Sequence, residues 1–134
     1  MSAALQAAII DLDGTLVDTL GDFDVALNQT LADLALPAVS RAVIEHTIGK
    51  GSQHLIHSIL SHVGADVSLY DAAWQRYQHH YQAINGEFAP LYPGAAEGVT
   101  RLKAAGLKLA CVTNKPLAFA QPLLAKKGLL RAFD

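Results

Sequence analysis

Hydrophobic positions divide the chain into two short apolar runs and several stretches with helical periodicity. The runs at residues 5–12 and 107–112 are brief and nearly continuous in apolar character. Such runs are typical of strands that are buried on both faces of a parallel sheet. We therefore predict that these two runs pair with each other in the core of an α/β fold.

Between the two runs, apolar residues recur every three or four positions, which predicts consecutive amphipathic helices from about residue 19 to 88. Ser40 is placed to cap the second of them. A further helix precedes the second strand, and another follows it. The four helical stripes of the insert are Leu20, Phe23, Leu27, Leu31 and Leu34; Val43, Ile44 and Ile48; Leu55, Ile56, Ile59, Leu60 and Val63; and Trp74, Tyr77, Tyr81 and Ile84.

Composition removes several classes of protein. The 134 residues are 51% hydrophobic and 16% charged, which excludes a disordered polar chain, and the net charge of −2 includes no basic block for binding nucleic acid. The single cysteine, Cys111, cannot form an internal disulfide. No apolar run approaches the roughly 18 residues of a membrane span, and no signal peptide is evident. We expect a cytoplasmic protein without a membrane partner.

The string with the clearest chemical content is Asp11-Leu12-Asp13-Gly14-Thr15-Leu16-Val17-Asp18-Thr19, directly after the first predicted strand. Ligands bind at this end of the strands in open α/β sheets. If the strand alternation continues to residue 13, both carboxylates leave on the same side and can hold a hard cation such as Mg²⁺. Gly14 would let the backbone turn so that amides face an anion such as phosphate. The structural alternative is a plain Asx-type turn.

A second string, Val112-Thr113-Asn114-Lys115, ends the second predicted strand. Alone, it is better explained as a loop with a helix cap, because Thr and Asn cap helices and Pro116 suits a first helical turn, but beside the first string a site becomes the favoured interpretation.

Together, the two strings resemble the first and second signatures of the haloacid dehalogenase superfamily, within its phosphatase branch and nearest to the phosphoglycolate phosphatase group. The resemblance implies a Rossmann-like core from residues 1–18 and 89–134, with residues 19–88 as an inserted four-helix cap. It implies that Asp11 is the nucleophile and Asp13 the general acid and base. Mg²⁺ would be bound by the Asp11 carboxylate and the Asp13 backbone carbonyl, and phosphate oxygens by Thr113 and the Asn114 amide.

The break Gly49-Lys50-Gly51 between two helices of the insert corresponds, by the same resemblance, to the loop that recognises the substrate. Lys50 could then place its charge against a substrate carboxylate. A solvated lysine in a turn is the equally weighted alternative.

These features predict a Mg²⁺-dependent phosphomonoester hydrolase of a small phosphorylated acid. The leading candidate reaction converts 2-phosphoglycolate to glycolate and phosphate through an aspartyl-phosphate. A sugar-phosphate mutase or a phosphonate hydrolase would share the first signature and the helical insert, and the phosphonate reaction would need a Schiff-base lysine, for which Lys50 is available. A non-catalytic binding module is the alternative from a different class, and intact Asp11 and Asp13 disfavour it.

The chain departs from the family in two respects. The lysine of the third signature and the acidic motif of the fourth, both expected further along, do not occur by residue 134, and Lys115 in the second signature does not replace that lysine. We therefore expect an incomplete core, with this piece the first part of a longer enzyme and inactive by itself. Two strands would leave a hydrophobic edge open, which predicts self-association.

Overall fold

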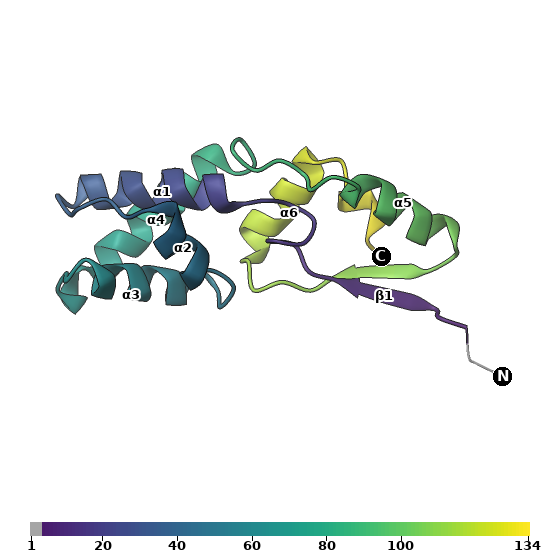
Figure 1. Ribbon diagram of the computed structural model, residues 1–134, viewed down its shortest axis with the longest axis horizontal. Coiled ribbons are helices and arrows are strands. Elements are labelled where there is room, and N and C mark those ends of the chain that lie inside the picture. Colours follow the sequence, from purple (N-terminus) through teal and green to yellow (C-terminus); the bar gives the residue numbers. More distant parts are fainter. Residues whose placement is uncertain (1–3) are drawn as a thin grey trace.

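The computed structural model describes residues 4–134 and contains one short parallel sheet (Figure 1). Strand β1 (Ala7–Ile10) pairs with β2 (Lys108–Cys111), with Ala7 opposite Lys108 and Ile10 opposite Cys111. The predicted parallel pairing is confirmed, although each strand is shorter than its apolar run. The carboxyl ends of both strands therefore lie side by side, and the Asp11 and Thr113 segments leave the sheet at the same edge.

Four helices connect β1 to the second half of the chain, and they form the helical part of the molecule. They are α1 (Leu20–Asp33), α2 (Arg41–Thr47), α3 (Ser52–His62) and α4 (Tyr70–Ile84), with a 3-10 turn η1 (Val67–Leu69) before α4. Ser40 caps α2 as predicted, because its hydroxyl accepts a hydrogen bond from the Val43 amide at 3.4 Å. The buried apolar side chains of these helices form one cluster, which Phe119 from the sheet part joins.

The sheet part consists of the two strands, α5 (Ala95–Ala104), α6 (Leu117–Lys126) and the 3-10 turn η2 (Leu130–Ala132). Its buried residues form a second apolar cluster, in which Leu12, Val17, Leu109 and Leu123 are almost fully inaccessible. Both α5 and α6 lie on one side of the sheet in Figure 1. No helix in residues 4–134 is long and apolar enough to cross a membrane.

The two chain segments that connect the helical part to the sheet part are held against each other. The Asp18 amide donates to the Pro90 carbonyl at 2.9 Å. The fully buried Asp22 carboxylate, in the first turn of α1, accepts hydrogen bonds from the amides of Gly86 and Phe88, each at 2.8 Å. The connections therefore meet at one crossing point, where α1 begins.

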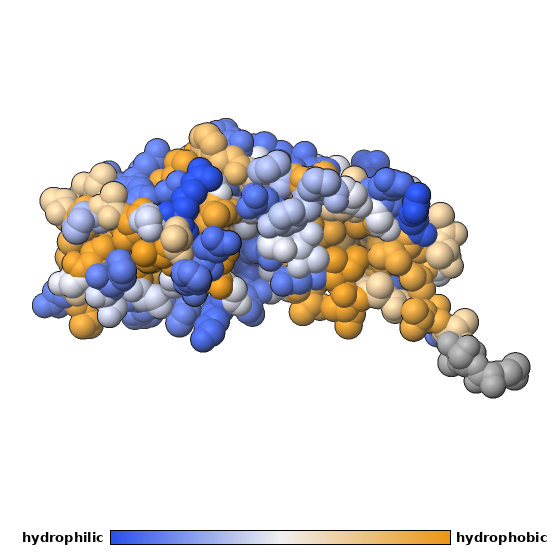
Figure 2. Space-filling view, in the orientation of Figure 1, coloured by the Kyte–Doolittle hydropathy of each residue, from blue (hydrophilic) through white to orange (hydrophobic). Residues whose placement is uncertain are grey.

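One apolar surface of the sheet part is uncovered. Leu5, Ile9, Val112 and Leu117 are 83%, 74%, 59% and 68% exposed, and Figure 2 shows hydrophobic surface gathered at this end of the molecule. Among residues 4–134, β1 has no strand on its outer side, whereas on the outer side of β2 the Leu109 amide donates to the Asp134 carboxylate and the Leu109 carbonyl accepts from the Asp134 amide, each at 2.8 Å. Large exposed apolar patches of this kind favour association between copies.

We therefore expect the 134-residue chain to self-associate, and Ile9→Lys to shift it toward monomer, because a charge on the exposed strand face opposes strand-to-strand contact. Light scattering coupled to size-exclusion chromatography measures the mass, which is 14.2 kDa for a monomer. Val67→Lys is the matched control, because Val67 is 78% exposed but belongs to the helical part. A monomeric parent chain, or an equal effect of both substitutions, would contradict this expectation.

Candidate active site

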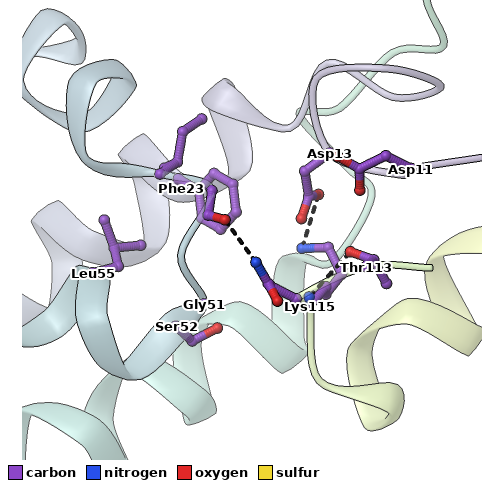
Figure 3. Close-up of a pocket in the computed structure, with 11 residues that line it drawn as sticks. Asp11, Asp13, Phe23, Gly51, Ser52, Leu55, Thr113 and Lys115 are labelled. Atoms are coloured by element: carbon purple, nitrogen blue, oxygen red, sulfur yellow. Dashed lines mark hydrogen bonds and ion pairs between the residues drawn. The ribbon is translucent and has the colours of Figure 1, made fainter.

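A small cavity lies where the sheet part meets the helical part, at the carboxyl ends of β1 and β2 (Figure 3). Its volume is about 60 Å³, which is room for a few water molecules. The residues that line it are Asp11, Asp13, Phe23, Ile48, Gly49, Gly51, Ser52, Leu55, Thr113, Asn114 and Lys115. Both strand-end strings and the loop before α3 therefore contribute to one site.

Asp11 and Asp13 both face this cavity, as expected from the strand alternation. The Asp11 side chain follows β1, is exposed, and accepts a hydrogen bond from the Leu12 amide at 2.7 Å. The Asp13 side chain is only 19% exposed, and its buried Oδ1 has no hydrogen-bond partner among residues 4–134. An acceptor in this position can bind a proton or a donor that a ligand brings into the cavity.

Gly14 makes the predicted turn but does not line the cavity. Its φ of +78° makes the turn after Asp13, where a side chain would be strained. However, its amide donates to the Val17 carbonyl at 2.9 Å, and Gly14 does not line the cavity. This geometry gives Gly14 the role of turn former and does not support the predicted contact with phosphate.

Thr113 and Asn114 follow β2 and line the cavity opposite the two aspartates. The Thr113 hydroxyl accepts a hydrogen bond from the Lys115 amide at 3.1 Å, so its own proton is free to be donated to an anion. The Asn114 side chain donates to the Gly49 carbonyl at 2.7 Å. The second strand end therefore contacts the predicted substrate loop directly.

The predicted substrate loop is brought to the cavity through its glycines and not through its lysine. Gly49 and Gly51 line the cavity with φ of +111° and +91°, in the left-handed region that favours glycine. Lys50 between them is exposed and is not a lining residue. In this structure, the charge of Lys50 does not enter the site.

Lys115 is a buried cavity residue to which the sequence analysis assigned no role. Its side chain is 2% exposed, and its Nζ lies 3.2 Å from Asp13 Oδ1 (Figure 3). The same ammonium group donates to the Tyr81 hydroxyl of α4 and lies over the rings of Phe23 and Tyr81, at 4.8 and 4.5 Å from their centroids. In the sequence, only membership of the second string places Lys115 near the site. Its contacts with Phe23 and Tyr81 could not be predicted, because both residues are distant from it in sequence.

Burial governs the titration of the groups around this lysine. Desolvation lowers the pKa of Lys115, and the negative charge of Asp13 opposes that change. Desolvation also raises the pKa of the Tyr81 hydroxyl well above its usual value. Tyr81 therefore stays protonated, and its oxygen accepts the hydrogen bond from Lys115.

The donor set at the cavity suits part of a magnesium site. Carboxylate and carbonyl oxygens are the ligands that Mg²⁺ prefers, and Mg²⁺ is commonly bound by one or two carboxylates together with substrate phosphate and water. The exposed Asp11 carboxylate lines the cavity and can supply such an oxygen, whereas Asp13 Oδ1 is already paired with the Lys115 ammonium at 3.2 Å. No cluster of three or more acidic, histidine or cysteine side chains that could hold a metal occurs in residues 4–134.

Comparison with known proteins agrees with this fold and site. A family model described as haloacid dehalogenase-like hydrolase matches residues 5–134. The chain therefore belongs to the haloacid dehalogenase-like hydrolase family, and the predicted α/β fold with flanking helices is confirmed.

Its similarity to individual proteins points to one group within that family. The chain is 40% identical over 131 residues to a plasmid-encoded phosphoglycolate phosphatase of Cupriavidus necator, matching 96% of this chain and 56% of that protein. It is 37% identical over 134 residues to a phosphoglycolate phosphatase of Colwellia psychrerythraea, with 96% and 59% covered. The chain thus spans between half and two thirds of the length of these relatives.

A solved structure shares the whole described fold. The crystal structure of a predicted phosphoglycolate phosphatase from Haemophilus somnus superposes with a TM-score of 0.93 at 29% identity, covering 97% of this chain and 60% of that one. The helical part and the sheet part therefore occur in the same arrangement in an experimentally determined relative.

Proposed function

We propose that this chain belongs to a Mg²⁺-dependent phosphatase that hydrolyses a small phosphorylated acid, with 2-phosphoglycolate as the leading substrate. The observation that carries the proposal is the meeting of Asp11, Asp13 and Thr113 in one cavity at the carboxyl edge of the sheet. A nucleophile, a proton donor and a phosphate-binding hydroxyl are the groups that this hydrolysis requires. Similarity to phosphoglycolate phosphatases supports the substrate class.

In the first step, an Asp11 carboxylate oxygen attacks phosphorus, and the bond between phosphorus and the ester oxygen breaks. Asp13 gives its proton to the leaving alkoxide, which departs as glycolate. In the second step, Asp13 takes a proton from water, and that water attacks the phosphorus of the aspartyl-phosphate. Phosphate leaves, and the Asp11 carboxylate is restored. The two aspartates thus divide one difficult displacement into two steps.

The remaining groups offset charge on the phosphoryl oxygens. Thr113 has a hydroxyl proton to donate, and the Asn114 backbone amide is the second donor in this proposal. Mg²⁺ bound by the Asp11 carboxylate and the Asp13 carbonyl would neutralise negative charge on the transferring group. Oriented charges of this kind are usually the largest contribution to such a reaction.

Nothing in the geometry favours the phosphonate alternative, because Lys50, the lysine that it would use, is exposed and outside the cavity. Gly49 and Gly51 border the site, so the loop that contains them is positioned to limit the size of the leaving group.

The test is phosphate release from 2-phosphoglycolate by the native gene product, with its intact mass measured in parallel. We expect turnover that requires Mg²⁺ and that stops when EDTA removes the metal. Without the metal, the negative charge of the phosphoryl group beside the Asp11 and Asp13 carboxylates is not compensated. Turnover that is unchanged by EDTA would contradict the metal role, and no turnover of any phosphomonoester with Mg²⁺ present would contradict the proposed function.

A further inference from the structure

The steps proposed above leave one buried charge in the cavity without a role. Lys115 is the one cation among the residues that line the cavity, and its side chain is more deeply buried than that of Asp13, at 2% against 19% exposure. Burying an ammonium group is costly unless anions or hydrogen-bond acceptors surround it. Its position therefore requires an explanation beyond packing.

The contacts of Lys115 leave part of its hydrogen-bonding capacity unused. An ammonium group has three protons to donate, and the structure gives it one hydrogen bond, to the Tyr81 hydroxyl. It also forms an ion pair with Asp13 Oδ1 at 3.2 Å, so at least one of its three protons remains for a ligand. The rings of Phe23 and Tyr81 complete its surroundings. An anion arriving in the cavity would find a positive charge that can still donate.

The position of this charge relative to Asp13 indicates which part of a substrate would meet it. A general acid must lie within about 3 Å of the oxygen that it protonates. The ester oxygen of the substrate would therefore lie beside the Asp13 carboxyl, and Lys115 Nζ is a neighbour of that same carboxyl. In 2-phosphoglycolate, the carboxylate is attached to the carbon that carries the ester oxygen, so it falls within reach of Nζ.

We propose that Lys115 is a specificity-determining residue that binds the carboxylate of the leaving group, and that it selects phosphomonoesters of 2-hydroxy acids. This inference rests on the proposed phosphatase function and names the feature of the substrate that the site recognises. It assigns to Lys115 the contact that the sequence suggested for Lys50. Tyr81 and the two rings hold the ammonium in place from the helical part.

The experiment compares kcat/KM for 2-phosphoglycolate and for ethyl phosphate, which carries a methyl group in place of the carboxylate. The native gene product is assayed with Mg²⁺, as wild type and as Lys115→Met, Lys115→Gln, Lys50→Met and Lys108→Met. Lys108→Met is the matched control, because Lys108 begins β2 at the end away from the site, with its side chain 78% exposed. Circular dichroism melts show which variants are folded.

We expect both Lys115 variants to lower the preference for 2-phosphoglycolate over ethyl phosphate by about 10- to 100-fold relative to wild type, as for loss of a charged hydrogen bond. The Lys50 and Lys108 variants should keep the wild-type preference. The preference is the ratio of kcat/KM for 2-phosphoglycolate to that for ethyl phosphate. Dividing the preference of each variant by that of wild type removes the difference in intrinsic reactivity between the two esters.

Three results would overturn the inference while leaving the phosphatase function intact. In the first, the Lys115 variants lose activity equally on both esters, which would mean that Lys115 only positions Asp13. In the second, Lys50→Met removes the preference. In the third, wild type hydrolyses the two esters with equal kcat/KM. This comparison uses wild type alone and so does not depend on whether any variant folds. A wild type that hydrolyses neither ester would overturn the proposed function, and this inference with it.

Discussion

Asp11→Asn is expected to lower Mg²⁺-dependent turnover of the native gene product by at least about 1,000-fold, because an amide neither attacks phosphorus nor supplies the anionic oxygen for the metal. The measurement is kcat for phosphate release from 2-phosphoglycolate, under conditions in which wild type is saturated. The substitution keeps the size of the side chain, and Asp11 is exposed, so the fold should be unaffected.

Asp18→Asn is the matched control for this loss. Asp18 belongs to the same string but lies outside the cavity, and its carboxylate contacts the Leu20 amide at 3.3 Å. We expect its turnover to remain within about threefold of wild type, as for removal of a weak local hydrogen bond. If Asp11→Asn kept more than a tenth of the wild-type rate, Asp11 could not be the nucleophile.

Asp22→Ala is expected to lower the free energy of unfolding by about 2–4 kcal/mol, because it leaves one buried and one partly buried amide without their charged acceptor. Those amides, on Gly86 and Phe88, belong to the connection that follows α4. Urea unfolding can be followed through Trp74, the single tryptophan of the sequence, which packs against the cluster of the helical part.

Asp71→Ala separates this effect from that of removing any acidic residue near a helix start. Asp71 also lies in the first turn of its helix, α4, but it is exposed. Its loss should cost less than about 1 kcal/mol, the usual size of a helix-dipole contribution. Equal costs for the two variants would show that the contacts of Asp22 with the connection contribute nothing measurable to stability.

Patterns that repeat locally were sufficient to predict the elements of this fold. Apolar spacing predicted α1 to α4 and both strands, and Ser40 marked the start of α2. Asp11 and Asp13 could be placed in one site because they follow a strand at a spacing that sends both side chains the same way. Thr113 and Asn114 joined them because parallel strands end at the same edge.

Contacts between segments distant in sequence were not available from such patterns. Asp22 resembles an ordinary acidic residue in a first helical turn, and nothing nearby indicates the amides that it binds more than sixty residues later. Similarly, the sequence places both Lys50 and Lys115 at loops near the site. Only the direction of each side chain after its turn decides that Lys115 is buried there while Lys50 points to solvent.

The contact between Lys115 and Tyr81 also limits how freely this architecture can exchange its helical insert. A graft that replaced residues 19–88 with the helices of another protein would leave Asp11, Asp13 and Thr113 untouched. It would nevertheless bring a new residue to the position of Tyr81, and a new one to that of Phe23. Unless those residues offered an oxygen acceptor and an aromatic face, Lys115 would be left as a buried charge with Asp13 as its main partner. Modular recombination at this site is therefore constrained by one lysine, which ties the evolution of the insert to that of the second strand end.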